Sequence, residues 1–250
     1  MGMNEPLSLA LALIAIFLSA GLVKGVTGMG LPTVAMGLLG SFMSPVTAAA
    51  ILIIPSLVTN LWQLLTGPSL QGVIRRFWPM MAAIALATAL STMLLSRINP
   101  DWSRTFIGVT LIVYSMYALL GPALEISKSL ERRTEAIVGL FTGAITGLTG
   151  IFVIPAVPFF QALNLSKDDL VQALGLSFTV STLSLALGLL IQDSLKLDQL
   201  SMSMAALIPA LAGMWIGQRI RTLLKPNTFR FLFLVFLLLL GIELAMRSFL

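Results

Sequence analysis

The sequence predicts an all-α, polytopic membrane protein made of two inverted repeats of five helical elements each, with short broken or re-entrant helices opening each repeat. Three observations predict this fold class: the apolar composition, an internal duplication and the distribution of Lys and Arg. Of the 250 residues, 58% are hydrophobic and 10% are charged, whereas apolar residues make up roughly 45–50% of a soluble domain. We therefore expect a single transmembrane domain over residues 1–250, with repeat one at about 1–125 and repeat two at about 126–250.

The composition also excludes several classes of function. The chain contains no Cys and no His, which removes disulfides, thiolate nucleophiles, Cys/His metal sites and Ser-His triads. We expect no cofactor, no metal and no enzymatic activity. The net charge is +5, but the basic residues are spread over short loops, so nucleic acid is not an expected partner and the lipid bilayer is.

The duplication is visible in the order of short motifs rather than in any single match. Repeat one opens with GLVKGVTGMGLPTVAMGLLG and repeat two with GLFTGAITGLTGIFVIPAVPFF, and SRINPDWSR is later echoed by KPNTFR, which places Arg104 opposite Arg230. The expected elements, in order, are 7–23, 31–42, 48–65, 77–95 and 105–121, followed by 136–147, 151–164, 170–190, 200–217 and 229–246.

Three of these elements are too short to span a bilayer, because about 20 helical residues are needed to cross its core. They are 31–42, 136–147 and 151–164. We expect broken or re-entrant helices there, since irregular backbone at membrane depth is tolerated only inside protein or beside a wet cavity. Whether the first two elements of each repeat span or re-enter stays open.

The first two elements of repeat one meet at a Gly/Thr-rich turn that carries a lysine. Lys24 has no acidic neighbour in sequence, and Gly28 and Gly30 allow the backbone to bend beside Thr27. Pro32 suits the first turn of the next helix, whose free N–H groups would form a small anion site with Lys24 nearby. The alternative for Lys24 is snorkelling to the membrane interface.

The corresponding turn of repeat two, TGAITGLTG, has no lysine. Its candidate binding residues are Thr146, Gly147, Thr149 and Gly150. We expect the two turns to approach each other from opposite sides, giving a site for a small mono- or dianion that is symmetric in backbone and asymmetric in charge. The alternative for these glycines is close helix packing.

The third element of each repeat carries a polar face. The candidate residues that could line a substrate path are Thr59, Asn60 and Gln63, together with Ser56, in repeat one and Ser177 and Ser181 in repeat two. Matching Ser44 with Ser166 places Thr59 opposite Ser181 and Asn60 opposite Thr182. The alternative is interhelical hydrogen bonding, worth under about 1 kcal/mol for each bond.

The basic residues that flank the later elements set the expected orientation. An odd number of crossings per repeat gathers most of them on one side, whereas an even number divides them equally and gives no orienting signal. The favoured side holds Arg75, Arg76, Lys128, Arg132, Arg133, Lys167, Arg219, Arg221, Lys225 and Arg230, and the other side holds Arg97, Arg104, Lys196 and Arg247. We therefore expect both termini on the side away from the cytoplasm and repeats that are inverted, an arrangement typical of secondary transporters.

Acidic residues are nearly absent from the expected spans, so no carboxylate is expected to couple transport to protons. Glu243 alone lies inside an apolar run, four residues before Arg247. We expect an ion pair between them at the helix end.

The paired turns KGVTGMGLP and TGAITGLTGIFVIP, with the loops SRINPDWSR and KPNTFR, resemble the TauE/SafE family of sulfite and organosulfonate exporters over about residues 10–245. The resemblance implies a transporter of the bacterial inner membrane for small sulfur-containing or carboxylate anions. In that membrane, the distribution of Lys and Arg places both termini on the periplasmic side. One departure is that Pro32 directly follows the glycines and Met36 occupies the usual proline place, whereas Pro155 keeps it.

The function expected from the sequence is export of a small anion by alternating access. The alternatives are a passive anion channel and a membrane-embedded enzyme acting on lipid phosphates, and the second would need intramembrane carboxylates or a histidine. The identity of the anion, the driving force and the direction of transport stay open. The oligomeric state stays open too, and a homodimer is one possibility.

Overall fold

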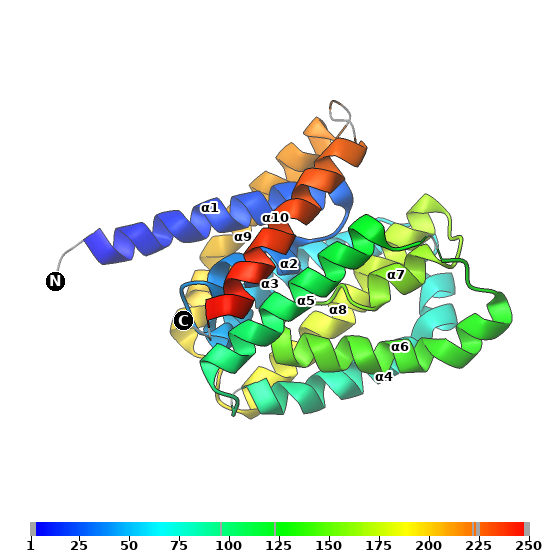
Figure 1. Ribbon diagram of the computed structural model, residues 1–250, viewed down its shortest axis with the longest axis horizontal. Helices are drawn as coiled ribbons and strands as arrows, with labels where there is room; N and C mark the ends of the chain where they lie inside the picture. Colours follow the sequence, from blue (N-terminus) through cyan, green and yellow to red (C-terminus); the bar gives the residue numbers. More distant parts are fainter. Residues whose placement is uncertain (1–3, 96, 123, 222, 224–225, 248–250) are drawn as a thin grey trace.

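The computed structural model describes residues 4–95, 97–122, 124–221, 223 and 226–247. Within these residues the chain forms ten α-helices and no strand (Figure 1). The helices are α1 (Asn4–Thr27), α2 (Leu31–Gly40), α3 (Pro45–Leu65), α4 (Leu70–Leu95), α5 (Pro100–Leu120), α6 (Lys128–Thr149), α7 (Ala156–Gln161), α8 (Lys167–Ile191), α9 (Leu197–Ile220) and α10 (Pro226–Met246).

Seven helices of the described part are long and apolar enough to cross a membrane: α1, α3, α4, α5, α8, α9 and α10. Large apolar side chains are exposed along them, as at Leu86 (59% exposed) and Ile208 (75%). Such exposure suits a protein whose surrounding solvent is hydrocarbon. The predicted fold class, an all-α multi-pass membrane protein, is confirmed.

The short elements agree only in part with the prediction. α2 has 10 residues, so it is as short as expected. The prediction for 136–147 was wrong in length, because α6 runs from Lys128 to Thr149 and begins with charged turns that an apolar criterion does not count. The prediction for 151–164 was also too long, since 151–153 are not helical and α7 covers Ala156–Gln161 only.

The helices of the two halves pack in a reciprocal pattern. α1 packs along α9, and α4 packs along α6. Within each pair the two helices run parallel to each other. The close approaches that establish this are Gly21 to Ala210 and Gly25 to Met214 in one pair, and Gly139 to Met80 and Gly143 to Ile84 in the other. Glycine at each crossing lets the two backbones meet without an intervening side chain.

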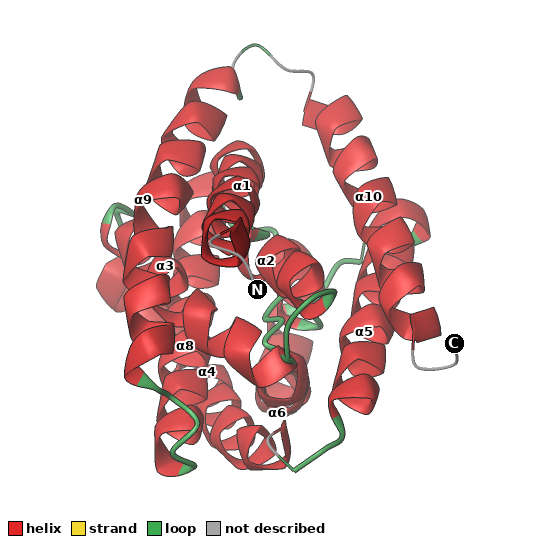
Figure 2. Cartoon of the chain, turned by 90° about the vertical axis from the view of Figure 1, so that its left-hand side faces the viewer, coloured by secondary structure: helices red, strands yellow, loops and turns green. Residues whose placement is uncertain are grey.

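The third and fifth helices of each half pack on their counterparts and run antiparallel to them. Between α3 and α8, Gly175 lies against Leu64, while Ser56 lies near Thr182. The matching contacts between α5 and α10 are Gly108 with Ala245 and Arg230 with Ala118. Figure 2 shows α1 and α2 in the middle of the molecule, between α3 and α9 on one flank and α5 and α10 on the other.

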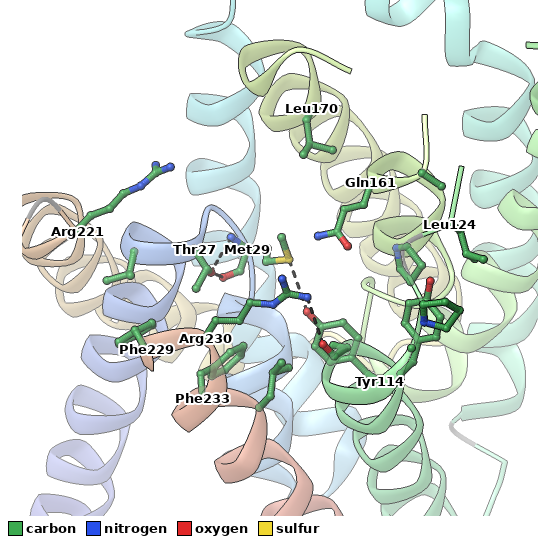
Figure 3. A pocket seen from close by; sticks show the side chains of 18 residues that line it. Thr27, Met29, Tyr114, Leu124, Gln161, Leu170, Arg221, Phe229, Arg230 and Phe233 are labelled. Atoms are coloured by element: carbon green, nitrogen blue, oxygen red, sulfur yellow. Dashed lines mark hydrogen bonds between the residues drawn. The ribbon is translucent and has the colours of Figure 1, made fainter. Parts of the chain in front are cut away.

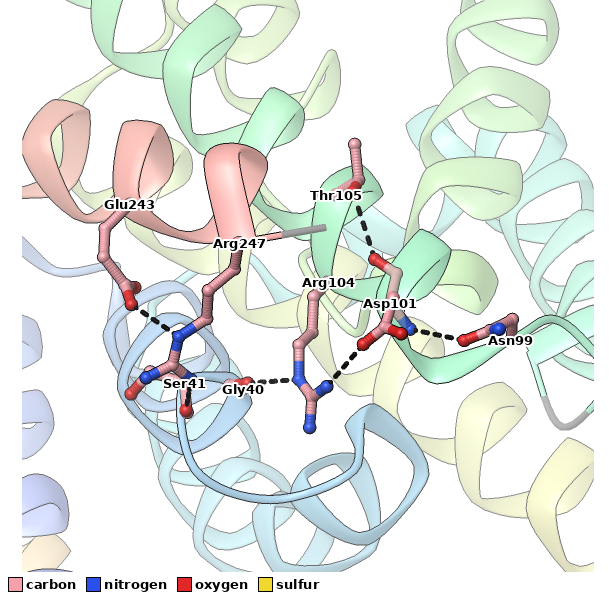
Figure 4. Close-up of polar contacts among 8 residues, drawn as sticks. All are labelled: Gly40, Ser41, Asn99, Asp101, Arg104, Thr105, Glu243 and Arg247. Atoms are coloured by element: carbon pink, nitrogen blue, oxygen red, sulfur yellow. Dashed lines mark hydrogen bonds and ion pairs between the residues drawn. The ribbon is translucent and has the colours of Figure 1, made fainter. Parts of the chain in front are cut away.

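Two arginines hold the C-terminal end of α2 (Figure 4). The Nε of Arg104 donates to the Gly40 carbonyl at 3.1 Å, and Nη1 of Arg247 donates to the Ser41 carbonyl. These carbonyls have no partner within the helix, and the helix dipole makes this end negative, so the guanidinium groups stabilise it. Arg247 also pairs with Glu243 at 3.0 Å, which confirms the predicted ion pair.

Candidate functional site

The turn between α1 and α2 depends on glycine because its backbone is left-handed at two positions. Gly28 has φ 80° and Gly30 has φ 99°, and Gly30 serves as the N-cap of α2. Side chains with a Cβ are strained in this region. Pro32 occupies the first turn of α2, as the sequence predicts, so one helix ends and the next begins within three residues, shortly after Lys24.

Lys24 lies inside the protein rather than at a membrane interface. Its side chain is 3% exposed, and its Nζ donates to Thr59 Oγ1 at 3.1 Å and to Asn60 Oδ1. The snorkelling alternative is therefore wrong. Among the described residues, Lys24 forms no ion pair, since the three ion pairs found there involve arginines.

The polar face of α3 extends this arrangement to α8. The amide of Asn60 donates to Ser56 Oγ at 3.1 Å and to Thr182 Oγ1 at 3.4 Å. Asn60 and Thr182 occupy the equivalent positions that the sequence predicts in the two halves. Lys24, Asn60 and Thr182 are thus brought together from three helices, α1, α3 and α8.

Gln63 lies one turn further along α3 and joins the first turn to α8. Its Nε2 donates to the Gly28 carbonyl at 3.0 Å and to the Val171 carbonyl at 2.9 Å. Its Oε1 accepts no hydrogen bond within the described residues. Thr27 lies beside this bridge, with its hydroxyl donating to the Met29 carbonyl at 2.7 Å.

Other buried hydroxyl groups near the middle of the molecule also lack partners. Ser177 and Ser181 on α8 and Thr33 on α2 are fully buried, and their oxygens have no hydrogen-bond partner in the described part of the chain. An unpartnered buried polar group costs about 1–3 kcal/mol. These groups lie on helices that pack on α3, which carries the Lys24 partners.

The second turn keeps most of its hydrogen bonds to itself. Thr146 donates to the Thr142 carbonyl and Thr149 to the Ile145 carbonyl, each at 2.7 Å. Gly150, with φ 68°, ends α6, and its Cα faces the Met36 side chain of α2. Both turns therefore border α2, and no hydrogen bond of the described residues joins one turn to the other.

Gly147 lies in the contact between α6 and α4. A Cβ at this position would be 2.6 Å from the Thr88 carbonyl oxygen and would also meet the Ser91 hydroxyl. Its place in the structure is that of a packing glycine.

A cavity of about 740 Å³ opens beside the first turn (Figure 3). It is formed by the ends of α1, α5, α7, α8, α9 and α10. Its polar lining residues are Thr27, Tyr114, Tyr117, Gln161, Arg221 and Arg230. The Arg230 side chain reaches across it, with Nη2 donating to the Ala118 carbonyl at 3.3 Å.

Comparison with known families gives one match, to the model described as sulfite exporter TauE/SafE, over residues 13–244. The chain belongs to the TauE/SafE family. It is therefore a membrane transporter and not an enzyme, with a small-molecule substrate and the lipid bilayer as its surroundings. The comparisons with curated proteins and with solved structures give no match.

The cavity residues of this TauE/SafE transporter were not among the sequence candidates, apart from Thr27. Tyr114 is far in the chain from Arg221 and Arg230, and only the fold brings their helix ends together. One sequence signal was available, because Arg230 ends the KPNTFR motif that echoes the first half. By itself, that motif indicates a repeat and does not indicate that Arg230 lines a cavity.

Proposed function

We propose that this TauE/SafE protein is a secondary transporter that exports a small anion by alternating access. Sulfite, an organosulfonate or a similar sulfur-containing or carboxylate anion fits the family and the charges of the site. The observation that carries the proposal is Lys24, a buried lysine held by Thr59 and Asn60 with no acidic partner among the described residues.

Lys24 needs a negative partner because a buried ammonium loses several kcal/mol of hydration. Two neutral acceptors offset only part of that loss, since neither carries a charge. An ammonium has three N–H donors, and Thr59 and Asn60 accept from two of them. A bound anion would take the third donor and supply the missing charge.

The cavity of about 740 Å³, hereafter called the transport cavity, offers a route from one membrane face towards Lys24. Thr27 and Met29 line its wall, and Leu170 lines it from α8. Gln63 bridges Gly28 and Val171, which are the neighbours of those lining residues. We propose that this bridge is the inner gate, with Arg230 and Arg221 attracting the anion to the cavity outside it.

The distribution of basic residues supports an orientation for this route. The cavity lies at the end of the molecule that carries Arg221 and Arg230, and the basic ends of α4 and α6 lie there as well. Lys225, counted with this group, lies outside the described residues. By the excess of Lys and Arg, this end faces the cytoplasm. In a bacterial inner membrane, this conformation is then open to the cytoplasm, and both termini lie on the periplasmic side.

The packing of the helices supports inverted repeats. Equivalent helices of the two halves run antiparallel where they meet, as α3 does with α8 and α5 with α10. A pseudo-two-fold axis in the membrane plane would produce this relation, together with the reciprocal α1–α9 and α6–α4 pairs. Such symmetry provides a second, outward-open conformation in which the two halves exchange their arrangements.

A passive anion channel is the remaining alternative, because family membership removes the lipid-phosphate enzyme. The experiment is reconstitution of the purified protein into liposomes with labelled sulfite, sulfoacetate and small carboxylates. We expect saturable uptake that is accelerated by an unlabelled anion inside the vesicles. Flux no greater than in empty vesicles for every anion contradicts the proposal, and flux that never saturates and shows no exchange indicates a channel.

Matched variants locate the cavity's contribution. Arg230→Gln removes a charge from the cavity and is expected to raise the KM for the anion. Arg133→Gln removes a charge from the exposed surface of α6, outside the cavity lining, and is expected to leave the KM unchanged.

A further inference from the structure

A second cavity lies where α4 and α6 begin. It is a pocket of about 810 Å³ with charged walls, called here the basic pocket. Its lining residues are Arg75, Arg76, Trp78, Pro79, Lys128, Ser129, Glu131, Arg132 and Glu135. None of them lines the transport cavity.

The basic pocket has a surplus of positive charge that the protein does not neutralise. Arg76 is used internally, because its Nε and Nη2 donate to the two carboxylate oxygens of Glu131 at 2.7 and 2.8 Å. Arg75, Lys128 and Arg132 form no ion pair within the described residues. Besides the Arg76–Glu131 pair, the pocket therefore presents three cationic groups against one carboxylate, that of Glu135.

The walls of the basic pocket continue into an apolar, outward-facing surface. Trp78, which lines the pocket, is 64% exposed. On α6, the exposed apolar side chains Ile137 and Phe141 (52% and 62%) follow directly after Glu135. Tryptophan beside basic residues at the end of an apolar span is typical of the membrane–water interface.

We propose that the basic pocket binds the headgroup phosphate of an anionic phospholipid, whose acyl chains lie on the apolar faces of α4 and α6. The free cations would hold the phosphate, since basic pockets between membrane helices recognise anionic headgroups. The apolar surface leading from the pocket favours a lipid over a soluble phosphate, because a soluble ion gains nothing from it. A bound lipid would contact α4 and α6 together, at the N-terminal ends of both helices.

The test is binding of phosphatidylglycerol to the purified full-length protein in detergent, followed by native mass spectrometry. Phosphatidylcholine and inorganic phosphate are titrated in parallel. The variant Arg75→Gln/Arg132→Gln keeps the Arg76–Glu131 pair and removes two free cations. We expect phosphatidylglycerol to bind the double variant about thirtyfold more weakly, because two of the cations that attract the anionic headgroup are removed.

The charge-matched control is Arg133→Gln/Lys167→Gln, two exposed residues that line neither cavity. It should bind phosphatidylglycerol as the unmodified protein does, and phosphatidylcholine should bind weakly to every variant.

An equal loss of phosphatidylglycerol binding in both double variants would indicate diffuse electrostatic attraction and overturn the site. Unchanged binding in Arg75→Gln/Arg132→Gln would overturn it too, as would inorganic phosphate competing as well as the lipid. Circular dichroism of each variant checks that it is folded, and anion transport is not needed for any of these readouts.

Discussion

In the proposed site, Lys24 is the residue that would make binding selective for an anion. Its neighbours Thr59 and Asn60 are neutral, so they orient the ammonium without cancelling its charge. In repeat two the equivalent position is Thr146, whose hydroxyl bonds to its own helix at Thr142. The two halves therefore supply similar backbones, and a single side chain supplies the charge.

We predict that Lys24→Met abolishes anion binding while the protein stays folded. The substitution removes a buried charge that costs several kcal/mol and leaves Asn60 Oδ1 without a donor, which costs about 1–3 kcal/mol. Because the two effects oppose each other, the melting temperature without anion should change little. An anion at 100 times its Kd should stabilise the unmodified protein by about 2.7 kcal/mol and the variant hardly at all.

The measurement is thermal unfolding in detergent across an anion series. Lys167→Met is the control, because Lys167 is exposed at the start of α8 and should keep the full anion-dependent shift. An anion-dependent shift that persists in Lys24→Met would show that the anion is bound elsewhere, with Arg230 in the transport cavity as the next candidate.

At the scale of the helices, glycines decide which pairs can approach closely. Gly139, Gly143 and Gly147 lie four residues apart on α6, and each faces backbone atoms of α4. The same relation holds where Gly21 and Gly25 of α1 face α9. The α4–α6 and α1–α9 pairs are thus built as rigid units, which suits helices that move together.

We predict that Gly147→Ala destabilises the protein by about 1–3 kcal/mol, because the new methyl group would overlap the backbone of α4. Its Cβ would lie 2.6 Å from the Thr88 carbonyl oxygen. Gly72→Ala is the matched control on α4 itself, since nothing lies within 4 Å of its added Cβ, and its melting temperature should be unchanged or slightly raised. Equal melting temperatures for the two variants would show that α4 and α6 are not packed this closely.

Much of the helix order could be predicted from the sequence, because long apolar runs and Gly/Thr turns are local signals. The start of α6 could not, since Lys128 and its neighbours form an amphipathic turn that packs on α4 despite its charge. The polar face that carries Thr59 and Asn60 is visible in the sequence, yet nothing in the sequence says that Asn60 Oδ1 faces Lys24 Nζ. Arg230 and Tyr114 were missed as cavity residues because only tertiary packing joins the ends of α5 and α10.

The whole molecule has a cavity at one end and a pair of arginine contacts at the other. At that other end, Arg104 and Arg247 donate to the last carbonyls of α2. Arg230, the counterpart of Arg104 by motif, instead lies in the transport cavity at the other end. If the halves exchange arrangements, Arg104 would be released from Gly40 as Arg230 is buried, so these two arginines would mark the two conformations.

Alternating access predicts that two equivalent positions change accessibility in opposite directions. Because the chain has no cysteine, single cysteines report accessibility without background. Ala118 lines the transport cavity. Its counterpart, when Arg104 is matched with Arg230, is Leu244, which is 0% exposed.

In proteoliposomes, a membrane-impermeant maleimide should label Ala118→Cys quickly and Leu244→Cys slowly. A transported anion should slow the first reaction and accelerate the second, since it allows the carrier to turn outward. Leu197→Cys, at a position 83% exposed, should react alike in both conditions. A Leu244→Cys protein that transports anion yet never becomes labelled would contradict the exchange of halves and favour a fixed pathway.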